Sequence, residues 1–392
     1  MLVKNDAHRA ERARSFALRG AGITAIAVTV VYVAAFSNFF ATEYRSKTAD
    51  GPERFFPLPA LNKDEYNARM LALAHYRAPA AASAAAEAAS TATTTRRIAS
   101  TTPPVLPFAT ATTSVSVPGR PWPVPTVYPD AGAVLPFHRV VAYYGNFYSA
   151  QMGVLGEYPP DQVLAMLAST TAEWAAADPA TPVIPAIQYI AVVAQGNAGP
   201  NGKYRLRMPD DQIDKALGMA SEMHGLLFLD VQVGLSTLPA ELPLLEKYLA
   251  LPNVELAIDP EFSMKYGNPP GTVIGTYDAA DVNYAAGYLA SIADAYRLPP
   301  KILVVHRFTE SMVTNYRDIR PLPEVQIVMD MDGWGSQAKK KGTYNAVIGP
   351  EPVQFTGIKL FYKNDLKPPS TGMLTPEEVL ALTPAPIYVQ YQ

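Results

Sequence analysis

Eight short apolar segments alternate with amphipathic stretches along residues 137–392, and this pattern constrains the fold more than any other feature. Alternation of this kind is typical of repeated βα units built around a parallel sheet. Eight such strands within about 250 residues also match the usual size of a (β/α)8 barrel. The sequence therefore predicts an α/β fold of the TIM type, with strands at 139–147, 183–192, 225–233, 253–262, 301–308, 324–332, 357–362 and 386–391.

The stretches between these strands carry the start signals of helices, because each begins at proline, aspartate or threonine. The helical segments are 159–177, 209–223, 238–251, 278–296 and 375–382. A ninth apolar run, 271–277, is interpreted as part of a long loop after the fourth strand. The competing architecture, an open doubly wound sheet, usually has a glycine-rich phosphate turn after its first strand, and YYGNFYSAQMG is not such a turn. No cofactor is therefore expected.

An uncharged apolar segment at residues 21–41 precedes the predicted barrel. Its length is enough to cross a bilayer as a helix, for which about 20 residues are needed. The basic side chains before it outnumber the acidic ones, which predicts that residues 1–20 are a cytoplasmic tail. We therefore expect a single-pass protein of the cell membrane with an extracellular barrel. A cleaved signal peptide and a buried core helix are the alternatives.

Residues 42–136 are predicted to be a spacer between the membrane and the barrel. From residue 78 to residue 136, most of the chain is Ala, Pro, Thr or Ser. Such a segment cannot bury enough apolar area to offset its chain entropy, so disorder is expected. A short amphipathic helix is predicted at 63–76, with Tyr66 and Met70 on one side.

Composition excludes several classes of protein. The chain has no cysteine, which excludes disulfide frameworks, thiolate zinc sites, cysteine nucleophiles and a lipid-modified N-terminal cysteine. Residues 136–392 carry 26 acidic and 18 basic side chains, whereas residues 1–135 carry 9 and 14. The acidic barrel disfavours nucleic acid as a partner. The lysine run at 339–341 is interpreted as solvated surface.

Polar side chains end most of the predicted strands. The active site of a (β/α)8 barrel lies at the C-terminal ends of its strands, and side chains two residues apart point the same way. A carboxylate inside an otherwise apolar strand is unfavourable unless it is paired or used. The candidate site residues are Tyr144, Gln188, Asp230, Gln232, Asp259, Glu261, His306, Asp330, Asp332, Trp334 and Lys359.

Several of these candidates also have a structural interpretation. Asp230 taken alone is more simply a helix cap or an acceptor of backbone N–H groups. Asp332, followed by glycine, equally fits a turn. His306 fits a hydrogen-bonded barrel histidine, and Lys359 could neutralise a buried carboxylate.

Paired carboxylates around a cleft favour cleavage of glycosidic bonds, in which one carboxyl donates a proton and the other attacks or stabilises charge. A hard-metal site on Asp230, Asp259 and His306 is the competing chemistry. No closely spaced histidine pair supports such a site, so no metal is expected. A serine nucleophile is disfavoured because the sequence has no GxSxG elbow.

The D-x-E ending of strand four (Asp259 to Glu261), the MDMDGWG of strand six and the terminal YVQYQ resemble glycoside-hydrolase-like (β/α)8-barrel proteins that bacteria secrete or anchor to their membranes. The resemblance covers residues 136–392. It implies that Glu261 is the general acid, that Asp259 orients it, and that Asp330 or Asp332 is its partner.

Chitinase-like barrels share this D-x-E and carry two further aspartates upstream of it. This chain has Ala257 and Val254 at those positions, which argues against substrate-assisted chitinase chemistry. The predicted function is a membrane-anchored glycoside hydrolase, or hydrolase-like protein, that acts on a polysaccharide or cell-envelope glycan. The seven candidates other than the four carboxylates of strands four and six are expected to bind substrate. A catalytically silent barrel that binds a glycan or a surface partner, and a metal-dependent hydrolase, are the alternatives.

Overall fold

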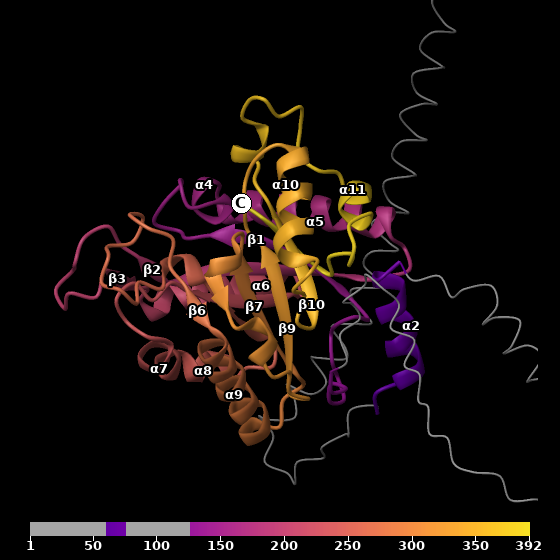
Figure 1. Cartoon of the computed structure of the whole chain (residues 1–392), viewed down its shortest axis with the longest axis horizontal. Coiled ribbons are helices and arrows are strands. Elements are labelled where there is room, and N and C mark those ends of the chain that lie inside the picture. The colour runs from indigo at the N-terminus through magenta and orange to yellow at the C-terminus, as the bar shows by residue number, and fades with distance from the viewer. Residues whose placement is uncertain (1–59, 76–125) are drawn as a thin grey trace, which may run out of the picture.

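The computed structural model describes residues 60–75 and 126–392. Eight strands close a barrel in which each strand is parallel to both neighbours, in the ring order β1, β2, β4, β5, β7, β9, β10, β11 and back to β1 (Figure 1). The predicted barrel of eight parallel strands is confirmed. The strands are β1 (Arg139–Gly145), β2 (Val183–Ala194), β4 (Leu226–Val231), β5 (Val254–Ile258), β7 (Lys301–Arg307), β9 (Val325–Met331), β10 (Phe355–Leu360) and β11 (Tyr388–Tyr391).

The fourth barrel strand is shorter than predicted. β5 ends at Ile258 because Pro260 has no backbone N–H for the ladder, and it starts a 3-10 helix, Pro260–Phe262. The side chain of Asp259 caps this turn by accepting a hydrogen bond from the backbone N–H of Glu261 at 3.0 Å. The D-x-E ending is therefore a strand end followed by a capped turn.

Helices cover the outside of the barrel. The longer ones, α5 (Pro160–Ala177), α6 (Asp210–Glu222) and α9 (Ala279–Tyr296), lie where the sequence predicted them, as does the short α11 (Pro376–Leu380). The segment 238–251 is broken into α7, the 3-10 helix η3 and α8, which is consistent with Pro243 lacking a donor N–H. Their bounds are α4 (Val154–Glu157), α5 (Pro160–Ala177), α6 (Asp210–Glu222), α7 (Leu238–Glu241), η3 (Leu242–Leu245), α8 (Glu246–Leu249), α9 (Ala279–Tyr296), α10 (Gln337–Thr343), π-helix η7 (Tyr344–Ile348) and α11 (Pro376–Leu380).

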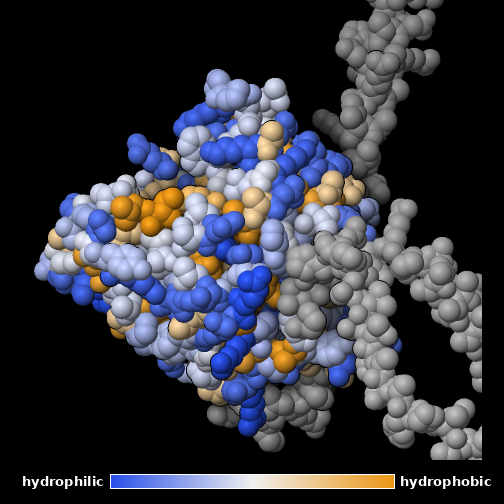
Figure 2. Space-filling model, in the orientation of Figure 1, coloured by the Kyte–Doolittle hydropathy of each residue, from blue (hydrophilic) through white to orange (hydrophobic). Residues whose placement is uncertain are grey.

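Three short strands lie outside the barrel ring. β3 (Arg205–Arg207) pairs antiparallel with the end of β2, while β6 (Tyr277–Asp278) and β8 (Val313–Thr314) form a small parallel sheet. The 3-10 turns Glu310–Met312, Tyr316–Asp318 and Asn364–Leu366 complete the loops. The run 271–277 is loop up to Thr276, in agreement with its interpretation from sequence. The face seen in Figure 2 is largely polar, with apolar residues in small patches.

The N-terminal end of the barrel is closed by a helix that precedes it in sequence. Tyr66, Met70 and Leu73 of α2 (Lys63–Leu73) are buried in the same cluster as the first interior residues of the strands, such as Val140 and Ile302. The helix predicted at 63–76 is thus present. It is not a free element of a spacer, because its apolar side forms part of the core.

The chain that follows on from residue 126 completes this closure. Leu135 is fully buried, and the N–H groups of Val134 and Leu135 both donate to Oε1 of Gln326 at 3.0 Å. Tyr128 packs edge-on against Tyr66 with ring centres 5.6 Å apart. The sequence predicted a spacer up to residue 136, whereas residues 126–136 pack against the barrel through contacts distant in sequence.

The remaining N-terminal predictions lie outside the described residues. These are the cytoplasmic tail (1–20), the membrane-spanning helix (21–41) and the spacer at 42–59 and 76–125. In the two ranges that the structure does describe, no helix has both the length and the apolar character that crossing a bilayer requires.

Candidate active site

A cavity of about 670 Å³ opens at the C-terminal ends of the barrel strands. Its walls come from the ends of the strands and from the loops that follow them, which is where (β/α)8 barrels build their active sites. Seven of the eleven predicted site residues line it, namely Tyr144, Gln232, Asp259, Glu261, Asp332, Trp334 and Lys359.

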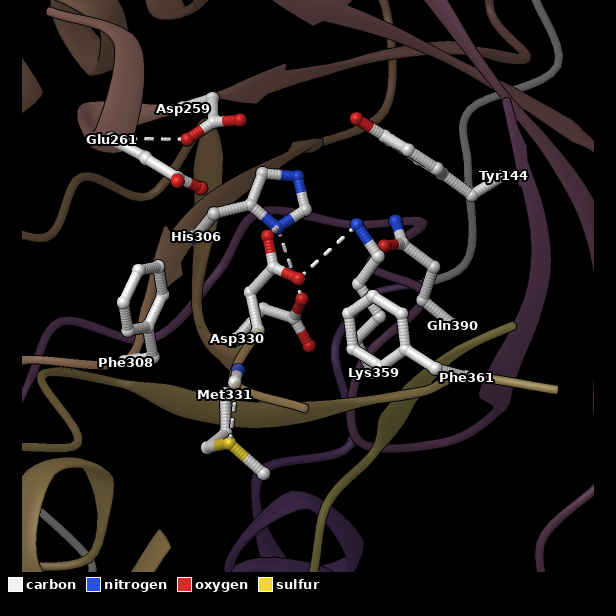
Figure 3. A network of polar contacts seen from close by, with 12 residues as sticks. Tyr144, Asp259, Glu261, His306, Phe308, Asp330, Met331, Lys359, Phe361 and Gln390 are labelled. Carbon is white, nitrogen blue, oxygen red and sulfur yellow. Dashed lines mark hydrogen bonds and ion pairs between the residues drawn. The ribbon is translucent and has the colours of Figure 1, made fainter. Parts of the chain in front are cut away.

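The other four predicted residues form a fully buried layer beneath the cavity. His306 lies between two carboxylates, with Nε2 at 2.8 Å from Oδ2 of Asp230 and Nδ1 at 3.1 Å from Oδ2 of Asp330. Gln188 donates to the same Asp230 oxygen at 2.6 Å. Gln188, Asp230, His306 and Asp330 have no solvent exposure and lie beneath the residues that line the cavity. They form the floor of the site, of which His306 and Asp330 are labelled in Figure 3.

The histidine of this floor is held in its charged form. Burial lowers the pKa of His306, but the charges and hydrogen bonds of Asp230, Asp330 and Asp332 together outweigh burial, and the pKa lies well above its usual value. Burial raises the pKa of Asp330, while its hydrogen bond to His306 acts in the opposite direction. An imidazolium between two carboxyl groups allows both ring nitrogens to donate, which fixes the ring and both side chains.

Asp332 lies above this floor and faces the cavity. Its Oδ1 forms an ion pair with Nζ of Lys359 at 3.1 Å, and its Oδ2 lies 3.4 Å from Nδ1 of His306. The same Lys359 ammonium lies 3.7 Å from the centre of the Tyr144 ring. Two cationic groups therefore stabilise the negative charge of Asp332 at the bottom of the cavity.

Asp259 and Glu261 face the cavity from the end of β5. Oδ2 of Asp259 accepts a hydrogen bond from Gln232 at 3.2 Å, and Gln232 also donates to the Tyr144 hydroxyl at 3.3 Å. Oδ1 of Asp259 accepts the Glu261 backbone N–H, as described above. Asp259 therefore fixes the backbone of Glu261, while the Glu261 side chain remains half-buried and without a hydrogen bond to another described residue.

Both carboxyl groups are shifted toward their neutral forms. Burial raises the pKa of Glu261 to about 7, and the negative charge of Asp332 adds to this shift. Burial also raises the pKa of Asp259 well above its usual range, although His306 opposes the shift. The site thus combines a carboxyl group whose pKa is about 7 with a carboxylate that is paired with lysine.

Some residues of the site were not identified from the sequence. The Tyr388 hydroxyl donates to Oε1 of Gln188, and Gln390 donates to that hydroxyl at 3.1 Å, so β11 completes the floor. Tyr388 and Gln390 lie two residues apart in YVQYQ and so point the same way, which is the pattern that identified Asp230 and Gln232. Phe308 and Phe361, which also line the cavity, carry no comparable signal because apolar residues are common in the loops and strand ends.

The lysine run is not simply solvated surface, as the sequence had suggested. Lys340 is buried, forms an ion pair with Asp365 at 3.1 Å and donates to the carbonyl of Gly333 at 2.8 Å. Asp365 in turn accepts the N–H of Gly335 at 2.9 Å. This pair joins the loop after β9 to the loop after β10 and so fixes Trp334, which lies between the two glycines.

In the described part of the chain, no three histidine, aspartate or glutamate side chains are arranged so that they could hold a metal ion. The set Asp230, Asp259 and His306, which the sequence offered as ligands, is divided between the floor and the cavity wall.

The fold and the site define a (β/α)8 barrel with a carboxylate-lined cavity. No protein-family model and no curated protein matches the chain. Among solved structures 21 chains match. One of them is GH26C from Muricauda sp., at 10% identity over 64% of this chain and 70% of that chain, with a TM-score of 0.27. A likeness this distant does not bear on activity.

Proposed function

We propose that the barrel is a glycoside hydrolase, or a hydrolase-like protein, that acts on a polysaccharide with Glu261 as its general acid. The observation that carries this proposal is the pairing of two unlike carboxyl groups in one cavity. Glu261 has a pKa of about 7, whereas Asp332 is ion-paired with Lys359. Glycosidic cleavage requires two carboxyl groups in different environments, one that can donate a proton and one that attacks or stabilises charge.

The roles follow from the contacts of each group. Protonated Glu261 donates its proton to the glycosidic oxygen as the bond breaks, and Asp259 positions it through the backbone hydrogen bond. Asp332 is the second carboxylate, which attacks or stabilises the developing positive charge of the sugar. Of the two partners that the sequence offered, Asp332 fits this role because it lines the cavity, whereas Asp330 is buried beneath it.

The test is the substitution Glu261→Gln in the full chain, assayed for release of reducing ends from a panel of polysaccharides. We expect a loss of about 10²- to 10⁴-fold in kcat/KM, the usual contribution of general acid catalysis. The matched control is Glu222→Gln, which makes the same chemical change at an exposed position of α6. Full activity of the Glu261→Gln variant on a substrate of the wild-type chain would show that the assignment is wrong.

A second candidate function is a catalytically silent barrel that binds glycan. The observation that favours it is Ala257, a buried residue of the barrel. Chitinase-like barrels carry an aspartate at this position, so this chain has one carboxyl group fewer there than they do. Glycan binding by the wild-type chain without release of reducing ends from any bound glycan would support this alternative.

We also propose that the chain is anchored in the cell membrane through residues 21–41, with its N-terminus in the cytoplasm and the barrel outside. Supporting this are the uncharged segment and the basic residues before it. Since α2 covers the end of the barrel opposite the cavity, the proposed anchor joins the barrel at its closed end, and the cavity opens on the far side.

The absence of cysteine makes this topology simple to test. Single substitutions Ser15→Cys and Ser221→Cys introduce one thiol each, in the proposed tail and on the barrel surface. In intact cells that express the full chain, a membrane-impermeant maleimide should label the Ser221→Cys variant and should reach the Ser15→Cys variant only after lysis. The opposite pattern, or equal labelling of both, would contradict the proposal.

A further inference from the structure

One wall of the cavity carries an exposed aromatic ring with two ammonium groups near it. Trp334, just after β9, is 48% exposed, and Nζ of Lys339 and of Lys367 lie 4.9 and 5.2 Å from the centre of its ring. Trp334 and Lys339 line the cavity directly. Contacts of this kind stabilise an ammonium group over an indole face.

These two lysines differ from their neighbours in having no carboxylate partner. Lys341, on the same helix as Lys339, is paired with Glu378 at 2.8 Å, and Lys363, on the same loop as Lys367, is paired with Glu157 at 2.7 Å. Within residues 60–75 and 126–392, no carboxylate lies within ion-pair distance of the Lys339 or Lys367 ammonium group. The wall therefore presents two unneutralised positive charges beside one ring.

The arrangement is built into the backbone. The buried Lys340–Asp365 pair fixes the loops on either side of the wall. The side chain of Lys339 crosses Gly335 so closely that a Cβ there would lie 2.6 Å from Lys339 Cδ. Gly335 also has a positive φ, a conformation that favours glycine. Any other residue at this position would displace the lysine.

The same cavity also contains carboxyl groups. Asp259 follows the end of β5, Glu261 lies in the turn after it, and Asp332 follows the end of β9. All three line the cavity above the His306 floor. The outer wall at Trp334 is cationic. Two like charges beside one ring repel each other, and an anionic group bound near both relieves that repulsion.

We propose that this wall, defined by Trp334, Lys339 and Lys367, binds the carboxylate of an acidic sugar, so that the ligand of the barrel is an anionic glycan. This inference rests on the proposed glycan-binding role of the same cavity. The indole supplies an apolar face for the sugar ring, and the ammonium groups pair with its carboxylate. Uronic acids and the lactyl or peptide carboxylates of cell-wall sugars share this chemistry.

The test compares binding of acidic glycans with their neutral forms to the full chain by calorimetry. The probes are oligogalacturonate and oligoglucuronate, each beside its methyl ester, and muropeptides beside their amidated forms. We expect at least one acidic form to bind about tenfold or more tightly than its neutral partner, with affinity that falls as salt is raised. Whether the uronates or the muropeptides show the effect identifies the source of the carboxylate.

The wall itself is tested with the double variant Lys339→Gln/Lys367→Gln. We expect it to lose the preference for the acidic form, while the control Lys341→Gln/Lys363→Gln, which removes the same charge from paired positions, retains it. Equal binding of acidic and neutral forms, no binding of either, or equal effects of the two double variants would overturn the inference. The readout of this test is binding, so the two proposals can fail separately. A chain that binds acidic glycans without cleaving them would refute the proposed hydrolase activity and leave the present inference standing.

Discussion

The two ends of the barrel are built on opposite principles. At the N-terminal end, α2 and residues 134–135 cover the first interior residues of the strands with apolar side chains, and the hydrogen-bonding capacity of Gln326 is used to fix the covering chain. At the C-terminal end, the interior residues are charged, and the cavity above them remains open.

This difference separates the sources of stability and chemistry in the molecule. Burial of apolar surface stabilises the fold by about 25 cal/mol per Å², and the closed end is covered by apolar side chains. The open end holds several carboxyl groups in a space that disfavours their charged forms, as the raised pKa values of Asp259 and Glu261 show. Substitutions at the two ends should therefore have different, and in one case opposite, effects on stability.

The largest effect is expected at the floor that lies between the two ends. His306→Leu removes the cation between Asp230 and Asp330 and leaves two buried carboxyl groups without it. Breaking a buried charge pair in this way lowers the free energy of unfolding by about 3–5 kcal/mol. Urea unfolding of the full chain measures the loss. The control, Val304→Ala, lies two residues earlier on the same strand and should lose about 2 kcal/mol. A loss no greater than that of the control would contradict the electrostatic role of the floor.

The next largest effect is expected at the closed end. Leu135 is fully buried against the barrel interior. Leu135→Ala should therefore lower the free energy of unfolding by about 3 kcal/mol through lost burial and the cavity left behind. The activity of the folded fraction should be unchanged, since the cavity of the site lies at the other end. Leu244→Ala, at an exposed residue, is the control and should change stability only slightly. Similar losses in the two variants would mean that residues 134–135 do not form part of the core.

At this closed end the sequence predicted the helix α2 but not the ordered segment 126–136. Hydrophobic periodicity identified the eight strands and the longer helices because their patterns are local. The order of residues 126–136 depends on contacts with Gln326, which is distant in sequence, and a composition rich in Ala and Pro says nothing of such contacts. Strand alternation likewise identified the charged interior residues. Alternation does not show how deep in the barrel a side chain lies. It therefore did not distinguish Asp330, which is buried beneath the cavity, from Asp332, which faces it.

A substitution at the open end should increase stability at high pH. Folding raises the pKa of Glu261 from 4.5 to about 7, so the folded chain binds an extra proton between these values. The stabilisation from this proton is complete below about pH 4.5 and is lost as the pH rises through 7. Glu261→Gln removes this dependence, so its free energy of unfolding at pH 8 should exceed that of the wild type by about 1–2 kcal/mol. This value is smaller than the full pKa shift implies, because the side chain is partly exposed to solvent.

The measurement is urea unfolding of both chains at pH 5 and pH 8, and the stability difference should appear only at pH 8. The kcat/KM of an active wild-type chain should fall above about pH 7 for the same reason, since the general acid is then ionised. A wild-type chain whose stability relative to Glu261→Gln rises with pH would show that the pKa of Glu261 is lowered, and the role of general acid would then be untenable.

The smallest effect is expected at a charged pair on the closed end, and it distinguishes what holds α2 in place. Glu65 and Arg69 form an exposed ion pair one turn apart at 2.9 Å. Pairs of this kind contribute about 0.3–0.5 kcal/mol in helices. Glu65→Gln should lower stability by no more than this in a urea titration, and molar salt should abolish the difference. Met70→Ala, one residue beyond Arg69 but buried, should lose several times as much. If the two losses were equal, charge rather than apolar burial would attach α2, and the contrast between the two ends of the barrel would fail.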